Sequence, residues 1–269
     1  MKKIVAIAGG GNGRLKDGIR KPYEIALMDQ EIVRLTEKQN PHFLFLAHSQ
    51  KELEVQFGYF NGMKEIYEGE YHCDCRMLTS EDLKDMEKAK SYVEWADIIY
   101  EGGGDTMSMI SLWRSTGFDN LLKEAWESGK VMCGVSAGAN CWFEACSTDS
   151  LRIQKNDPTL PLTSCDCLGF IPGFFVPHSN EPGRMESSKD ILKDSDMIGF
   201  FLSNCAALEI VDDKYRLLLT DASNYGIEAY GMKVYWKDGK CIEKPISTSL
   251  EFQSLDELLS ISDEKVKKI

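Results

Sequence analysis

The motif Gly-x-Ser-x-Gly places Ser136 between Gly134 and Gly138, directly after the apolar run 131–135. A buried strand that turns abruptly into a helix presents such a serine at the edge of a sheet, with its hydroxyl exposed. Small neighbours are needed there, because the backbone is strained at the bend and the helix packs close to the strand. The helix that we expect from Ala137 would add a free N–H group and a positive dipole end. This segment therefore predicts the nucleophile of an acyl transfer together with one oxyanion donor.

A serine hydroxyl is a weak nucleophile and needs a neighbouring base, for which histidine is the usual choice. The chain has four histidines. His42 and His48 open and close one predicted strand, and His72 lies in another stretch of mixed polarity. His178 follows the apolar segment Gly-Phe-Phe-Val-Pro, downstream of the serine. We therefore expect His178 to be the base.

A third group should orient the imidazole and stabilise its cation. Glu144 should lie about two turns into the helix after the serine and so lead away from the active-site end. Asp149, in Ser-Thr-Asp-Ser, lies where that helix should have ended and turned back. We predict Asp149 as the third residue, while Glu144 and a simple turn-capping role for Asp149 both stay open.

A second glycine loop, Gly102-Gly103-Gly104, follows the apolar run 98–101 and precedes a predicted helix. Its bare backbone can approach a substrate oxygen, so we expect the second oxyanion donor here. A phosphate cradle is the competing interpretation, but neither a Walker ending nor a spaced G-x-G-x-x-G motif is present. The glycine run 9–13 after the first strand is explained by a tight connection.

These motifs resemble those of the peptidase E family of serine peptidases, which are relatives of cyanophycinase. The resemblance rests on Glu-Gly-Gly-Gly-Asp-Thr, Gly-Val-Ser-Ala-Gly-Ala-Asn-Cys-Trp-Phe-Glu and Leu-Gly-Phe-Ile-Pro-Gly-Phe-Phe-Val-Pro-His. It runs from the first strand to about Asp221. It implies a fold similar to the class I glutamine amidotransferases and a Ser-His-acid triad. The best-known members release an N-terminal aspartate from dipeptides, but the segment Ser-Asn-Glu-Pro-Gly-Arg departs from that pattern.

The resemblance also implies roles for individual residues. These are the nucleophile Ser136, the base His178, the third member Asp149, and the oxyanion donors Gly103 or Gly104 together with Ala137. From the residue types alone, Arg184 could bind a substrate carboxylate and Glu181 a free amino terminus. A surface ion pair between Arg184 and Glu181 is the alternative.

Composition excludes several other classes of function. The chain of 269 residues has 43% hydrophobic and 28% charged residues and a formal charge of −12, so we expect a globular protein without a nucleic-acid partner. The apolar start is too short for a signal peptide, and no run is long enough to span a membrane. Nine scattered cysteines favour a reducing cytoplasm over disulfides. The Cys-x-Cys spacing at 73–75 and 165–167 is narrower than zinc sites prefer, so we expect neither a metal nor a cofactor.

Apolar runs at 4–8, 43–47, 76–78, 98–101 and 131–135 alternate with helical patterns at 24–37, 80–95 and 120–128. Such alternation predicts an α/β fold with a doubly wound, mostly parallel sheet, whose ligands bind beyond the carboxyl ends of the strands. After a helix at 185–195, short strands at 206–211, 216–219, 227–230, 234–236 and 241–243 predict an antiparallel extension over about 206–253. A helix at 255–266 closes a single domain of residues 1–269.

The sequence thus predicts a serine peptidase that acts on small peptides. An esterase is less favoured, because α/β-hydrolases place their acid and histidine late in the chain. A small-molecule binding or sensing protein without catalysis is the non-enzymatic alternative. The substrate preference and the oligomeric state, a homodimer included, stay open.

Overall fold

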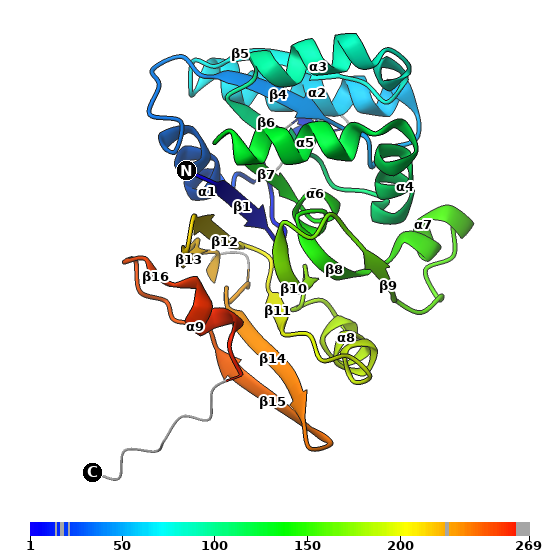
Figure 1. Cartoon of the computed structure of the whole chain (residues 1–269), viewed down its shortest axis with the longest axis vertical. Helices are drawn as coiled ribbons and strands as arrows, with labels where there is room; N and C mark the ends of the chain where they lie inside the picture. Colours follow the sequence, from blue (N-terminus) through cyan, green and yellow to red (C-terminus); the bar gives the residue numbers. More distant parts are fainter. Residues whose placement is uncertain (14, 17–18, 21, 224–225, 262–269) are drawn as a thin grey trace.

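The computed structural model describes residues 1–13, 15–16, 19–20, 22–223 and 226–261. Its larger sheet has the strand order β16-β13-β12-β1-β7-β6-β4-β5 (Figure 1). The five parallel strands are β1 (Lys3–Ile7), β4 (His42–Leu46), β5 (Asp74–Leu78), β6 (Ile98–Glu101) and β7 (Val131–Val135). β1, β4, β6 and β7 are almost completely buried, as expected of strands covered on both faces.

Helices cover both faces of this sheet, as Figure 1 shows. One buried cluster joins the sheet to α1 (Ala26–Arg34) and α2 (Leu53–Gly69). Another joins its opposite face to α3 (Met86–Trp95), α4 (Thr106–Thr116) and α5 (Phe118–Glu127). The predicted doubly wound α/β fold is therefore confirmed.

The helices and strands that we expected in the first sheet and its covering helices agree closely with the structure, except that one expected helix is divided in two. The helix predicted over 80–95 is split into a 3₁₀ turn, η1 (Glu81–Lys84), and α3. Asp85 lies between them and accepts a hydrogen bond from the Lys88 N–H at 3.1 Å. This side-chain cap starts a new helix at Met86 and ends the preceding turn.

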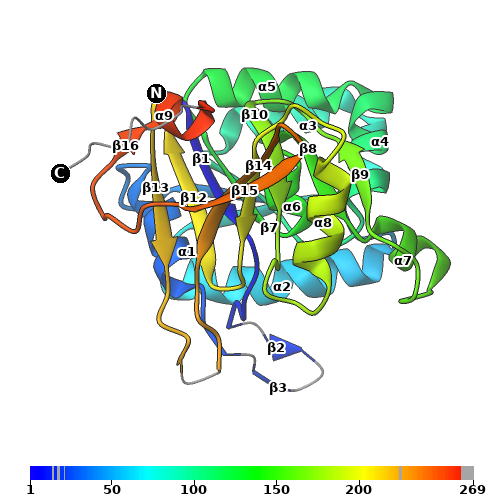
Figure 2. The ribbon, with the colours of Figure 1, turned by 90° about the horizontal axis from the view of Figure 1, so that it is seen from below.

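A second sheet has the order β15-β14-β11-β10-β8-β9 (Figure 2). Its strands are β8 (Phe143–Thr148), β9 (Thr163–Asp166), β10 (Ile171–Val176), β11 (Gly199–Leu202), β14 (Gly231–Lys237) and β15 (Lys240–Pro245). The helices α7 (Ser150–Lys155) and α8 (Arg184–Leu192) belong to this part of the chain. A small pair, β2 (Leu15–Lys16) and β3 (Ile19–Arg20), completes the N-terminal segment.

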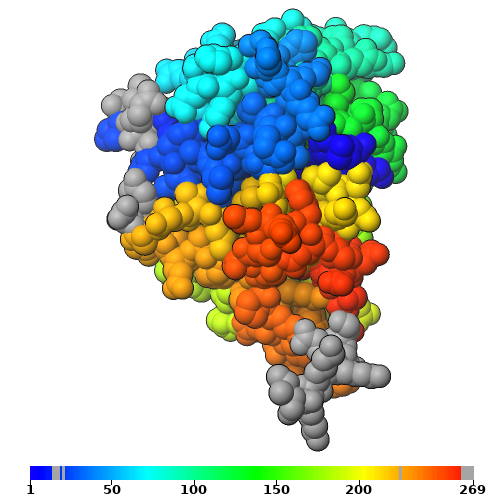
Figure 3. Space-filling model, turned by 90° about the vertical axis from the view of Figure 1, so that its left-hand side faces the viewer, coloured from blue at the N-terminus to red at the C-terminus, as the bar shows by residue number. Residues whose placement is uncertain are grey.

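The strands after residue 205 pair antiparallel, but they are divided between the two sheets. β12 (Ala206–Val211), β13 (Lys214–Leu219) and β16 (Gln253–Ser254) extend the first sheet beyond β1, whereas β14 and β15 extend the second. Seen from the side, this C-terminal part occupies the lower half of the molecule (Figure 3). The two-residue turn at Asp238 and Gly239 has positive φ at both positions, as a type I′ hairpin requires.

Two predictions for this region need correction. The strand expected at 227–230 is wrong, because Ile227 forms only an isolated bridge with Ala222 and β14 begins at Gly231. The final helix, α9 (Leu255–Leu259), is shorter than predicted, and residues 262–266 of that prediction lie outside the described residues. In the described chain, no helix combines the length and apolar character needed to cross a membrane.

Candidate active site

Ser136 lies at the predicted sharp bend, between β7 and α6 (Ala137–Asn140), with φ 57° and ψ −111°. A positive φ is strained for any residue other than glycine and is frequent at functional positions. Gly138 is required here, because a Cβ atom on it would collide with the carbonyl oxygen of Glu101. The helix after the serine has only four residues, so its dipole is smaller than the sequence suggested.

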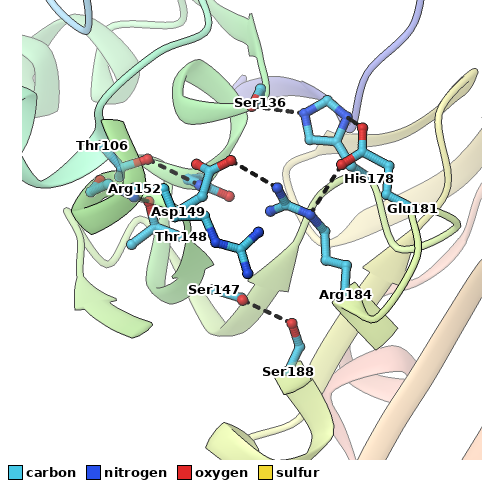
Figure 4. A network of polar contacts seen from close by, with 12 residues as sticks. Thr106, Ser136, Ser147, Thr148, Asp149, Arg152, His178, Glu181, Arg184 and Ser188 are labelled. Atoms are coloured by element: carbon cyan, nitrogen blue, oxygen red, sulfur yellow. Dashed lines mark hydrogen bonds and ion pairs between the residues drawn. The ribbon is translucent and has the colours of Figure 1, made fainter. Parts of the chain in front are cut away.

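His178, which follows β10, meets this serine as expected. Its Nε2 atom lies 2.9 Å from the Ser136 Oγ atom (Figure 4). The imidazole side chain is 19% exposed, and burial lowers the pKa of His178. A lowered pKa keeps the ring neutral, and therefore able to accept a proton, at neutral pH.

The other ring nitrogen of His178 contacts a residue that sequence reasoning missed. Asn204 Oδ1 lies 2.6 Å from His178 Nδ1, so Nδ1 carries the proton and donates it to this oxygen. The Nε2 atom is then left with a lone pair toward Ser136. Gly9 makes this contact possible, because a Cβ atom on Gly9 would collide with both side chains. Asn204 lies in the loop between β11 and β12, and no sequence motif marks it.

The structure does not bring Asp149 to the imidazole. Asp149 follows the strand β8 and precedes α7, and its Oδ2 atom accepts a hydrogen bond from Arg184 Nη2 at 2.9 Å. Glu144 is exposed within β8 and accepts from the Gly173 N–H at 3.3 Å. Both expectations assumed a long helix after Ser136, whereas a strand resumes at Phe143.

Glu181 does lie beside the proposed base, and Arg184 links Glu181 to Asp149 (Figure 4). The Arg184 side chain is 7% exposed and bridges the two carboxylates, with its Nε atom 3.5 Å from Glu181 Oε2. Glu181 Oε1 is also 3.7 Å from His178 Nδ1. The guanidinium therefore already has two anionic partners, and Glu181 raises the pKa of His178 against the effect of burial.

The loop Gly102 to Gly104 lies on the other side of Ser136. A Cβ atom on Gly103 would lie 3.4 Å from Ser136 Cβ and 4.0 Å from its Oγ, which places this backbone against Ser136. The Gly103 N–H also donates to Tyr59 Oη at a long 3.4 Å. Gly104 has no room for a side chain, because a Cβ atom there would collide with the Ser49 carbonyl oxygen.

Side chains from the loop after β4 hold this glycine loop in place. Gln50 Nε2 donates to the Gly103 carbonyl oxygen at 2.5 Å, and Ser49 Oγ donates to that of Gly102 at 3.2 Å. The buried carboxyl of Glu101 in turn accepts the N–H groups of Ser49 at 3.1 Å and His48 at 3.3 Å. Glu101 therefore joins the two loops at the carboxyl ends of neighbouring strands.

Glu101 should make stability depend on pH. Burial raises its pKa to about 8, well above the value near 4.5 of an unfolded glutamate. Between these values the folded state keeps a proton that the unfolded state has lost, so stability falls as pH rises. We expect Glu101→Gln to reduce the loss of Tm between pH 5 and pH 8 by roughly 5 °C, measured by thermal unfolding. Other buried carboxyls, such as Asp29, are present in the unmodified protein and in the variant, so they do not contribute to the difference. Equal changes of Tm in the unmodified protein and in Glu101→Gln would refute the raised pKa of Glu101.

Comparisons with known proteins relate this chain to peptidases. The sequence profile of peptidase family S51 matches residues 8–218. An uncharacterized peptidase of Bacillus subtilis (strain 168), YgaJ, is 32% identical over 236 residues, which cover 86% of this chain and 91% of that relative. Peptidase E of Streptomyces coelicolor is 27% identical over 128 residues, which cover 44% of this chain and 51% of that relative.

A solved structure shares the fold. The crystal structure of a peptidase from an acI-B1 actinobacterium has a TM-score of 0.66 and 19% identity, and the match covers 94% of this chain and 97% of that one. The similarity supports the expected likeness to the class I glutamine amidotransferase fold.

Proposed function

We propose that this chain, which belongs to peptidase family S51 and is a serine-type peptidase, hydrolyses small peptides with Ser136 as nucleophile and His178 as base. The observation that carries the proposal is the distance of 2.9 Å between Ser136 Oγ and His178 Nε2. It is supported by the strained backbone of Ser136, because a φ of 57° is typical of a nucleophilic serine at a sharp turn between strand and helix. The family match supports the resemblance to peptidase E that the motifs indicated.

In the proposed reaction, Ser136 Oγ attacks the peptide carbonyl while His178 Nε2 takes its proton. The oxyanion then accepts hydrogen bonds from the N–H of Ala137 and from the Gly103 or Gly104 backbone. The imidazolium gives its proton to the leaving amine as the C–N bond breaks, which leaves an acyl-enzyme. Water, deprotonated by the same ring, then attacks the ester carbonyl of the acyl-enzyme. The bond to Ser136 Oγ breaks as the imidazolium returns its proton to that oxygen, and the acid is released. Asn204 replaces Asp149 in our proposal as the residue that orients the imidazole.

The charged residues beside His178 bear on substrate preference. Arg184 is engaged with Asp149 and Glu181, and these two carboxylates already balance its charge, so we do not assign it to a substrate carboxylate. A preference for N-terminal aspartate is therefore not part of the proposal. Glu181 has a side chain that is 46% exposed, and we propose that it binds the positive charge of a substrate.

A fluorophosphonate probe tests whether Ser136 is activated. The serine oxygen displaces fluoride from phosphorus only when a base takes its proton, so we expect native protein to be labelled at Ser136. Peptide mass spectrometry of the labelled protein would identify the modified residue. Heat-denatured protein is the control, because it keeps the serine but loses the imidazole beside it. A native protein that stays unlabelled would favour the non-catalytic binding protein.

A further inference from the structure

A cavity of about 1140 Å³ opens beside the glycine loop, and the proposed reaction does not use it. Its walls come from the loop after β4, from η1, from Gly104 and Asp105, and from α4 and α7. The two helices that form one wall are held together, because Gln154 Nε2 of α7 donates to Asp105 Oδ2 at the start of α4 at 2.9 Å. Figure 1 shows α4 and α7 on the same side of the molecule.

Four aliphatic side chains line this cavity among polar and charged ones such as Lys51 and Glu81. Leu83 is buried and Leu112 is partly buried in the wall, whereas Val55 is 48% exposed and Ile153 is 50% exposed. Two half-exposed aliphatic residues that face one cavity are typical of a site for an apolar group. Phe57, on the same helix as Val55, is also 50% exposed but does not line the cavity.

The order of the strands fixes how far this cavity lies from the nucleophile. Ser136 follows β7, the glycine loop follows β6, and the cavity lies over the ends of β6, β4 and β5, which are the next strands in the sheet. Neighbouring strands are about 4.8 Å apart, so two steps from β7 to β4 measure about 10 Å. An extended peptide advances roughly 3.3 Å per residue and covers that distance in about three residues.

The position of His178 gives the direction of the peptide. Its ring packs against Gly9 at the end of β1, on the side of β7 opposite to β6. In the proposed reaction the imidazolium protonates the leaving amine, so the leaving portion lies on the β1 side. The acyl portion, which is N-terminal to the scissile bond, then runs over β6 toward the cavity.

We propose that the cavity binds an apolar side chain of an oligopeptide substrate, about three residues N-terminal to the scissile bond. This inference rests on the proposed function and makes it more specific. The enzyme then acts on peptides longer than dipeptides, and Val55 and Ile153 determine its preference. The substrate backbone passes Gly104, where a side chain on the enzyme would be excluded by the Ser49 carbonyl.

A combinatorial hexapeptide library, analysed by mass spectrometry of the products, tests the proposal. We expect leucine, isoleucine, valine and phenylalanine to be enriched about three residues before the cleaved bond. For purified peptides, we expect kcat/KM to be roughly ten- to a hundredfold higher with leucine than with glutamate at that position. Val55→Glu should remove this ratio, whereas the matched variant Phe57→Glu should retain it.

The alternative outcomes separate this inference from the proposed function. Cleavage of dipeptides alone, absence of apolar enrichment, or an enrichment that Val55→Glu leaves unchanged would overturn the cavity as a substrate site. A Ser136→Ala protein that still cleaves the library would instead overturn the proposed function. The Tm of Val55→Glu should match that of Phe57→Glu in thermal unfolding, which excludes a folding defect as the cause of the lost preference.

Discussion

Replacing Ser136 with alanine is expected to lower kcat by roughly four to six orders of magnitude, because the serine, the base and the oxyanion donors act as one unit. The variant keeps the glycine loop and the remaining contacts of His178, so substrate binding should change much less than turnover. Steady-state kinetics on a cleaved oligopeptide would measure both. The small residual rate should reflect only binding and the oxyanion donors.

Ser179 provides the matched control for this experiment. Ser179 follows His178 in the sequence and is buried. Its Oγ atom donates a hydrogen bond to Tyr230 Oη at 3.1 Å and not to the imidazole. We expect Ser179→Ala to retain most of the activity. A folded Ser136→Ala protein with unchanged turnover would remove the serine mechanism from consideration.

The parts of the site that follow from local sequence could be predicted. Continuous apolar runs predicted β6 and β7 at their observed bounds. β7 ends directly before Ser136, and β6 ends at the glycine loop that lies against Ser136. Gly134 and Gly138 marked the bend, because a tight crossing of strand and helix leaves no room for side chains. His178 could be found as well, since β10 ends just before it.

The partner of the base could not be predicted, because tertiary packing alone brings it there. Asn204 follows β11 of the second sheet and precedes β12, which pairs with β1 of the first. Next to this pair of strands, the Cys205 N–H donates a hydrogen bond to the Gly9 carbonyl oxygen at 2.8 Å. This hydrogen bond holds the neighbouring Asn204 beside His178. Neither hydrophobic periodicity nor turn chemistry carries information about a contact between strands of two sheets.

The failure of Asp149 and Glu144 as candidates has a local cause. We expected a helix after Ser136 that would end near Asp149, whereas α6 ends after one turn and Phe143 begins a strand. Aromatic residues at 142–143 favour an extended conformation. In the strand, Glu144 points away from the buried core, and Asp149 is carried to Arg184 instead of the imidazole.

Replacing Asn204 with alanine is expected to lower kcat by about two to three orders of magnitude. The variant removes the acceptor for the Nδ1 proton of His178, so the ring is free to rotate or to take the tautomer that has no lone pair toward Ser136. KM should change little, because Asn204 acts through the base. Unchanged turnover in a folded Asn204→Ala protein would show that the ring needs no such partner.

The pH dependence of kcat distinguishes this positioning role from a structural one. Asn204→Asp keeps an oxygen at Nδ1 and adds a negative charge, so it should restore activity and move the acidic limb of the profile to higher pH. Glu181→Gln should move that limb to lower pH, because it removes the carboxylate that raises the pKa of His178. A structural defect would lower the rate at every pH and shift neither limb, so opposite shifts in these two variants would identify His178 as the group that both residues control.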